Sequence, residues 1–133
     1  MKNNILAVLG GTVALFGLGY LIYVVLFGGA TFHLGPGAKD VVTELNLPAI
    51  ILMEVLYAVL ITIIFGRWAQ IKTFATGAKA GLIIGALIGT ASLLELYATT
   101  TLTNINGIAF GAVTYAVRYA VAGGVIGWLL GRE

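Results

Sequence analysis

The sequence predicts an all-α integral membrane protein, a bundle of four transmembrane helices in one domain of 133 residues. Sixty per cent of the residues are hydrophobic and 9% are charged, whereas soluble domains average about 45–50% and about 25%. Four apolar runs also reach the roughly 20 residues that a helix needs to cross a hydrocarbon core. A soluble fold of this composition would expose large apolar patches and aggregate, so we expect a lipid bilayer around it.

The four helices are predicted at residues 5–27, 47–65, 78–98 and 107–130. The first run exceeds the roughly 7 to 15 residues of a signal-peptide core and has no clean cleavage site, which favours a retained helix over a leader. Asn46 and Pro48 are typical of a cap and a first helical turn, and Asn104 or Asn106 is the cap candidate of the last helix. The short links make sequential neighbours antiparallel.

The two predicted ends of the bundle differ in charge. One end carries Lys2, Arg67, Lys72, Lys79 and Arg132, and the other carries Lys39 with Asp40 and Glu44. Because cytoplasmic loops are enriched in lysine and arginine, both termini are predicted to be cytoplasmic and loop 28–46 to lie outside. Trp68 and Trp128 then lie at the cytoplasmic interface, where indole rings favour the headgroup level.

Small residues recur every four positions in the third and fourth helices. In lipid, helices associate through close backbone approach and hydrogen bonds rather than through the hydrophobic effect. The predicted packing residues are Gly77, Gly81, Gly85 and Gly89 in one helix and Ala112, Ala116, Ala120 and Gly124 in the other, with Gly123, Gly127 and Gly131 beside them. These ladders, which resemble a glycine zipper, predict contact between the two helices. The alternative is a homo-oligomer interface or a sliding surface.

Three ionisable residues fall within the apolar runs, namely Glu54, Glu95 and Arg118. Such residues are candidate functional sites because burying charge in a membrane is costly. We expect all three to meet in the outer half of the bundle. Helical spacing adds Tyr57, Ser92 and Tyr115 to this predicted ligand or proton site, with Thr114 beside Tyr115.

The charged cluster is compatible with three roles. It is an ion-pair network that fixes helix register, a proton or cation site, or a pocket in which Arg118 and the tyrosines bind an anionic or carbonyl-bearing molecule. The proton or cation site follows from stoichiometry, because two carboxylates share one fixed cation.

Several function classes are excluded by what the sequence lacks. A net charge of +2 comes from few charges of both signs without a basic stripe, so no nucleic-acid partner is expected. There is no phosphate-binding glycine motif and no cysteine, and a lone His33 lacks the neighbours of a metal or haem site. Ser92 is the only serine and no hydrolase motif surrounds it. We therefore expect no enzyme activity, no cofactor and no metal.

The chain resembles a family of small bacterial four-helix membrane proteins classified as a domain of unknown function. The resemblance rests on Leu18-Gly19-Tyr20-Leu21-Ile22-Tyr23 followed by Phe27-Gly28, and on the small residues from Gly123 to Gly131. It covers nearly the whole chain and implies a four-helix fold in a bacterial inner membrane. Small multidrug exporters share the length and helix count, but their first helix carries an essential glutamate that is absent here.

These observations predict proton-coupled or small-solute transport through the cluster of Glu54, Glu95 and Arg118. The alternative is a non-catalytic accessory or assembly subunit of a membrane complex. Transport requires an aqueous route to the charges, and four helices barely enclose one. The expected partners are therefore the lipid bilayer and a second copy of the chain, or a larger membrane complex.

Overall fold

The computed structural model describes residues 2–26, 47–99 and 103–132. Within these ranges the chain is helical, with four α-helices and no strand. The described ranges exclude Phe27 and the predicted outer loop, and with it His33, Lys39, Asp40 and Glu44.

The first two helices each end in a π-helical segment. α1 (Lys2–Tyr20) continues into η1 (Leu21–Leu26), and α2 (Leu47–Ile63) continues into η3 (Ile64–Trp68). After η3 the chain turns at Gln70, whose φ of 53° is in the left-handed region. The Gln70 side-chain amide donates to the carbonyls of Gly66 and Arg67 at 3.5 and 3.3 Å. These bonds satisfy carbonyls that the end of a helix leaves without intrahelical partners.

α3 (Phe74–Thr99) and α4 (Ile105–Leu130) are the two longest helices among the described residues. α3 begins at Phe74, before the predicted start at residue 78. Of the two candidate caps of α4, Asn104 is the one used. Its backbone is extended, and its side-chain oxygen accepts a hydrogen bond from the Gly107 amide at 2.7 Å. This is the geometry of an N-cap that satisfies a free backbone donor of the first turn.

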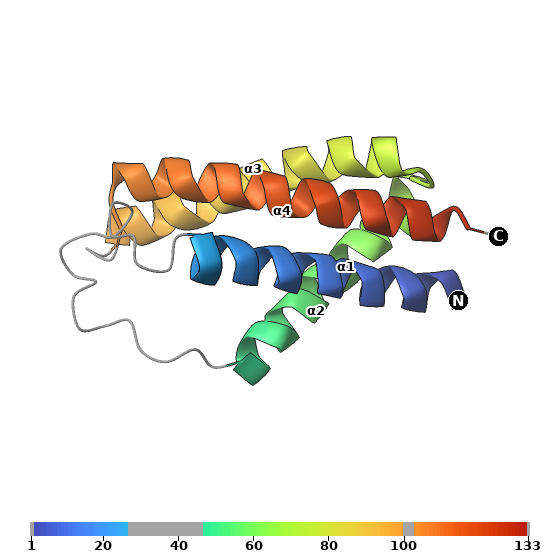
Figure 1. Cartoon of the computed structure of the whole chain (residues 1–133). Coiled ribbons are helices and arrows are strands. Elements are labelled where there is room, and N and C mark those ends of the chain that lie inside the picture. The colour runs from blue at the N-terminus through green and yellow to red at the C-terminus, as the bar shows by residue number, and fades with distance from the viewer. Residues whose placement is uncertain (1, 27–46, 100–102, 133) are drawn as a thin grey trace.

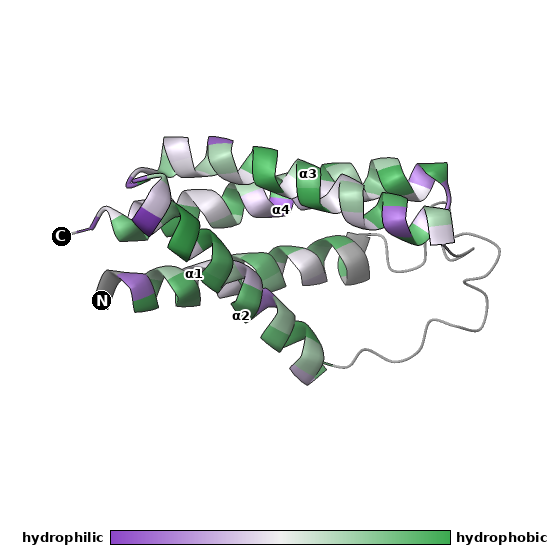
Figure 2. Ribbon diagram, turned by 180° about the vertical axis from the view of Figure 1, so that it is seen from behind, coloured by the Kyte–Doolittle hydropathy of each residue, from purple (hydrophilic) through white to green (hydrophobic). Residues whose placement is uncertain are grey.

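Among the described residues, three helical segments are long and apolar enough to cross a membrane, whereas four spans are predicted from the sequence. They are Leu47–Trp68, Phe74–Thr99 and Ile105–Leu130, and Asn4–Tyr20 is a shorter apolar helix. The described part of the first predicted span consists of α1 followed directly by η1, and Phe27, the last residue of that span, lies outside the described residues. Figure 2 shows α2 and α3 as mostly hydrophobic, with hydrophilic residues where α2 ends and in the link to α3.

α4 is the central helix of the bundle. α3 packs along one of its faces in the most extensive helix contact, and α1 packs along another. α2 crosses α1 obliquely and has only a small contact with α4 (Figure 1). Both chain ends and the link between α2 and α3 lie at the same end of the bundle (Figure 1).

The hydrophobic core lies among α1, α2 and α4. Its buried members are Ala7, Leu15, Ile61, Phe65, Tyr119, Ala122, Ile126 and Leu130. Large hydrophobic side chains are also exposed on every α-helix, for example Val13 on α1, Leu56 on α2 and Leu87 on α3. The bundle is therefore apolar on the outside as well as within.

α3 contacts α4 through backbone rather than through large side chains. Its buried residues are Gly77, Gly81, Gly85 and Gly89. A β-carbon on Gly81 would overlap the Tyr119 carbonyl oxygen, and one on Gly89 would lie 2.9 Å from the Gly111 carbonyl oxygen. Only glycine permits the two helices to lie this close.

The face of α4 that meets these glycines is one position away from the predicted one. It contains Gly111, Tyr115, Tyr119, Gly123 and Gly127. The predicted residues Ala112, Ala116 and Ala120 are only half-buried, and Gly124 packs against the Phe74 ring. Tyr115 and Tyr119 fit in this face of α4 because their carbonyl groups and β-carbons point toward the glycines of α3. The ring of Tyr119 contacts Tyr57 of α2 instead.

Candidate functional site

A buried ion pair joins α2 to α4. Arg118 donates from Nη2 to Glu54 Oε2 at 2.6 Å, across 64 residues of sequence. Glu54 is 1% exposed and Arg118 is 4% exposed. A short, charge-assisted bond of this kind is among the strongest hydrogen bonds in proteins.

Helical spacing places both members of the pair in the interior. Glu54 begins the buried stripe of α2, which continues through Ala58, Ile61 and Thr62. Arg118 shares a face of α4 with Ala122 and Ile126, the face that turns toward α1. Each charge therefore replaces an apolar side chain in an otherwise regular helical pattern.

Gly19 of α1 lies directly over the ion pair. A β-carbon on Gly19 would lie 3.5 Å from Glu54 Oε2 and 3.6 Å from Arg118 Nη2. These distances are ordinary van der Waals contact. Three helices therefore meet at the pair, and α1 encloses it with backbone.

A group of three tyrosines surrounds the pair. The Tyr115 and Tyr119 rings stack with centroids 5.8 Å apart, and Tyr57 meets Tyr119 edge-on at 5.6 Å. The Arg118 guanidinium carbon lies 5.4 Å from the Tyr115 ring centroid, which is a cation–π contact. Tyr115 and Tyr119 belong to the tyrosine group and also contact the glycines of α3. The tyrosines therefore link the ion pair to the α3–α4 interface.

Tyr119 was missed by the sequence prediction although it is fully buried at the centre of this group. A signal for it was present. Gly111, Gly123 and Gly127 belong to a spacing of four in which Tyr115 and Tyr119 fill the two intermediate positions. The alanines at the neighbouring positions form a second spacing of four that contains only small residues, which is why the sequence pattern favours them.

Some buried polar atoms in the described part of the chain have no hydrogen-bond partner there. They include Glu54 Oε1, the Tyr119 hydroxyl and Thr62 Oγ1. Leaving such a group unsatisfied costs about 1–3 kcal/mol. The Glu54 carboxylate therefore keeps one oxygen able to accept a hydrogen bond from a water or a small donor.

Glu95 and Ser92 do not join the cluster, contrary to prediction. Both are exposed on α3, and the Glu95 backbone carbonyl accepts a hydrogen bond from Thr99 at 2.8 Å. The contact face of α3 continues from Gly89 to Leu93, which packs on Gly111. Glu95 lies two residues, or about 200°, further around the helix and therefore points away from α4.

The remaining predicted residues are close to the pair. Tyr57 and Tyr115 lie in the tyrosine group, and Thr114 is buried and donates to the Gly111 carbonyl at 3.2 Å. Tyr57 also lines an open depression of about 390 Å³ on α2, together with Ala49, Leu52, Met53 and Leu56. This depression is almost entirely apolar. Among the described residues, no three carboxylate or histidine side chains are grouped to hold a metal.

Comparisons with known proteins do not extend this description. No family model, no curated protein and no solved structure matches the chain. The resemblance to small bacterial four-helix membrane proteins therefore stays a prediction. The assignment of a role depends on the geometry of the pair formed by Glu54 and Arg118.

Proposed function

We propose that the chain is an integral membrane protein with a structural role, a non-catalytic accessory or assembly subunit in which the Glu54–Arg118 pair fastens α2 to α4. The enclosure of the pair carries this proposal. Both side chains are almost fully buried within one chain, and α1 covers them at Gly19. A charge that binds a passing solute must be reached from water, whereas a charge that holds helices together is best enclosed.

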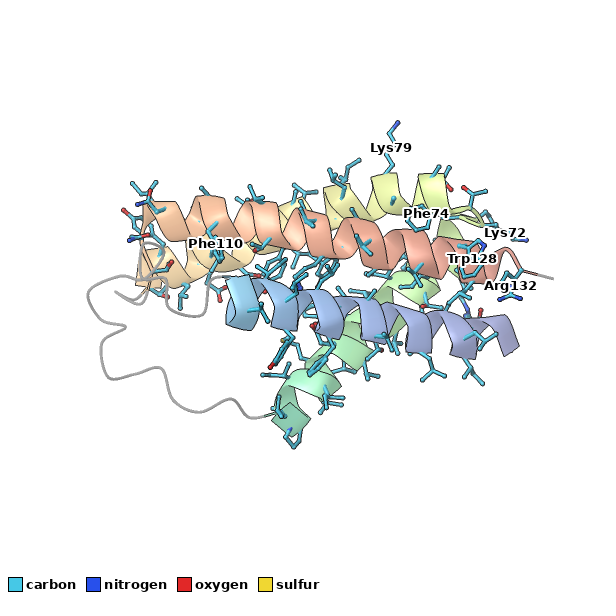
Figure 3. The ribbon with its side chains drawn as sticks, viewed as in Figure 1. Lys72, Phe74, Lys79, Phe110, Trp128 and Arg132 are labelled. Atoms are coloured by element: carbon cyan, nitrogen blue, oxygen red, sulfur yellow. The ribbon has the colours of Figure 1, made fainter. Side chains whose placement is uncertain are left out.

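The membrane setting is supported by the length of three helices and by the apolar outer surface. We place the chain in a bacterial inner membrane with both termini cytoplasmic. The end that holds the termini also holds Lys72 and Arg132 (Figures 1 and 3), and Arg67 lies in the last turn of η3, just before the link at that end. This agrees with the tendency of basic residues to stay in the cytoplasm.

A second candidate function is the passage of protons or of a small polar solute. It is favoured by the Glu54 Oε1 and Tyr119 hydroxyl atoms, which are buried without a hydrogen-bond partner among the described residues. Tyr57 lies between Tyr119 and the open depression on α2. With Glu95 on the outer surface, Glu54 is the one carboxylate of the predicted trio that remains for this role.

A proton-flux assay separates the two functions. The full chain is reconstituted into vesicles that contain a pH-sensitive dye, and a potassium diffusion potential drives protons inward. A structural role gives the same flux as protein-free vesicles, for the natural chain and for the paired variant Glu54→Leu/Arg118→Met. A flux above that of protein-free vesicles that the paired variant abolishes, while its helix content is unchanged, would overturn the structural role.

The assembly role has a separate test on α3. This helix is held along one glycine face, and Leu87 on another face is 67% exposed. The chain has no cysteine, so Leu87→Cys introduces one reporter. Oxidation in membranes should give a covalent dimer if α3 meets a second copy. Val13→Cys, at an equally exposed position of α1, is the matched control and should give none.

Failure of Leu87→Cys to cross-link would remove self-association through this face of α3. Equal cross-linking of both variants would indicate random collision in the membrane rather than an interface. Either result contradicts the homodimer, and the first leaves a subunit role only with a different membrane protein.

A further inference from the structure

Four basic residues from different segments gather at one end of the bundle. Arg67 is the penultimate residue of η3, Lys72 lies in the link to α3, Lys79 lies in the second turn of α3 and Arg132 follows α4. All four are exposed. Figure 3 shows Lys72 and Arg132 beside each other at the end where α4 stops, and Lys79 pointing away from the bundle.

Described acidic residues do not neutralise this end. Glu54 is paired with Arg118 in the interior, and Glu95 lies in the last turns of α3, toward the opposite end. Glu133 adjoins Arg132 in the sequence but lies outside the described residues, and it offsets at most one of the four charges. Arg67, Lys72 and Lys79 therefore present net positive charge to the surroundings.

Two exposed tryptophans lie among these cations. Trp68 is 73% exposed and Trp128 is 51% exposed, and the Arg132 guanidinium carbon lies 5.3 Å from the Trp128 ring. A soluble protein would bury such rings, whereas the headgroup region of a membrane accommodates their apolar body and polar N–H together. Tryptophans at the headgroup level put the neighbouring cations at the depth of the lipid phosphates.

We propose that this basic end, formed by Arg67, Trp68, Lys72, Lys79, Trp128 and Arg132, binds the headgroups of anionic phospholipids. The inference rests on the proposed membrane insertion and adds a lipid preference to it. Charge complementarity selects the ligand, because basic side chains close to a membrane surface attract anionic lipids and not zwitterionic ones. The cations lie near the end of η3, at the start of α3 and after the end of α4, so one or two phosphates held there would also tie these helix ends together.

The two tryptophans make the test selective, because they are the only ones in the chain. Their fluorescence therefore reports on this end alone. The full chain is reconstituted into mixed bilayers of phosphatidylcholine and phosphatidylglycerol in equal amounts. Bromine atoms, which quench tryptophan on contact, are placed on the acyl chains of one lipid or of the other.

Brominated phosphatidylglycerol should quench about two- to fivefold more strongly than brominated phosphatidylcholine, reflecting local enrichment of the anionic lipid. The ratio should fall toward one between about 0.05 and 0.5 M NaCl, because salt screens surface charge. The triple variant Arg67→Gln/Lys72→Gln/Lys79→Gln should lose the preference. Glu95→Gln changes the net charge by one in the opposite sense and toward the opposite end of the bundle, and should leave the ratio unchanged.

Vesicles of brominated phosphatidylcholine alone separate the two proposals. An absence of quenching in these vesicles would show that the tryptophans do not reach the bilayer, and the membrane proposal itself would fail. Strong quenching there, combined with equal quenching by the two lipids in the mixed bilayer, would overturn the lipid preference alone. A preference that survives in the triple variant would overturn it as well. Quenching of the triple variant by phosphatidylcholine verifies that it still inserts.

Discussion

α4 is held on two sides by opposite kinds of contact. Toward α3 it presents backbone and small residues over most of its length, from Gly111 to Gly127. Toward α2 it makes a small contact that contains the ion pair of Glu54 with Arg118 and, beside it, the edge-on ring contact of Tyr57 with Tyr119. The first contact is distributed along a whole helix, and the second is concentrated at one point.

The difference teaches how each contact fails. Van der Waals contacts are individually weak and add up along a helix. The α3–α4 interface therefore depends on the distance between the two backbones, which each glycine of the stripe keeps short. The α2–α4 contact depends on two charges whose burial is tolerable only while they remain paired. The first interface is therefore sensitive to added volume, and the second is sensitive to loss of a partner.

The largest expected effect is from breaking the ion pair on one side. Arg118→Met keeps most of the side-chain volume but leaves the Glu54 carboxylate buried without its cation. The free energy of unfolding should fall by about 3–5 kcal/mol, measured by denaturant titration in mixed micelles.

Glu54→Leu/Arg118→Met is the control for this prediction. Removing both charges should recover most of the lost stability, because replacing a buried pair by apolar residues is often neutral. If the double variant is as unstable as Arg118→Met, the loss comes from packing and the concentrated electrostatic contact proposed here is wrong.

The next effect concerns the distributed interface. In Gly81→Ala the new methyl group would overlap the carbonyl oxygen of Tyr119, and backbone cannot rotate away as a side chain can. Separation of the helices should lower the free energy of unfolding by about 1–3 kcal/mol. Gly17→Ala adds the same methyl group to α1, where nothing lies within 4 Å, and should be neutral or slightly stabilising. Equal effects at both positions would contradict a close α3–α4 contact.

Sequence reasoning found the helices because apolar length and composition are properties of single segments. It also identified Gly77 to Gly89 as a regular stripe and singled out Glu54 and Arg118 as charges inside apolar runs. Both patterns are visible along one helix, without knowledge of any neighbour. The structure buries all of these residues.

The errors concern relations between helices. Glu95 lies 18 residues, or about five ideal turns, beyond Gly77 and would share its face on an isolated helix. The contact with α4 follows a spacing of four, which drifts about 40° per step and reaches Leu93 instead. On α4, bulky Tyr115 and Tyr119 occupy the glycine-facing stripe because a carbonyl group, rather than a ring, meets Gly81. Which atoms of a residue face a neighbour cannot be read from residue size.

A smaller effect is expected at the start of α4, the helix that the two contacts share. Asn104→Ala removes the side-chain oxygen that accepts from the Gly107 amide at 2.7 Å. The loss should be about 1 kcal/mol, as for other N-caps. Asn104 lies about 21 Å along α4 from Arg118, and the effects of distant changes usually add. The loss should therefore add to that of Gly81→Ala, whose contact is at Tyr119, and to that of Arg118→Met. Asn104→Asp preserves the cap and should have nearly the stability of the natural chain. If the losses in a double variant do not add, the cap is coupled to the contact that the second substitution disturbs.

The smallest effect is also the sharpest comparison between the two regions. Gly19→Ala makes the same change as Gly81→Ala, but its methyl group would lie 3.5 Å from Glu54 Oε2, at ordinary contact distance. Alanine is favoured over glycine in a helix by up to about 1 kcal/mol, so stability should rise by less than that amount. Both variants are measured in the same micelles. If the free energy of unfolding falls in Gly81→Ala and rises in Gly19→Ala, the α3–α4 interface requires glycine, whereas α1 tolerates either residue over the ion pair. A loss at Gly19 as large as at Gly81 would mean that α1 is held against the pair as tightly as α3 is held against α4.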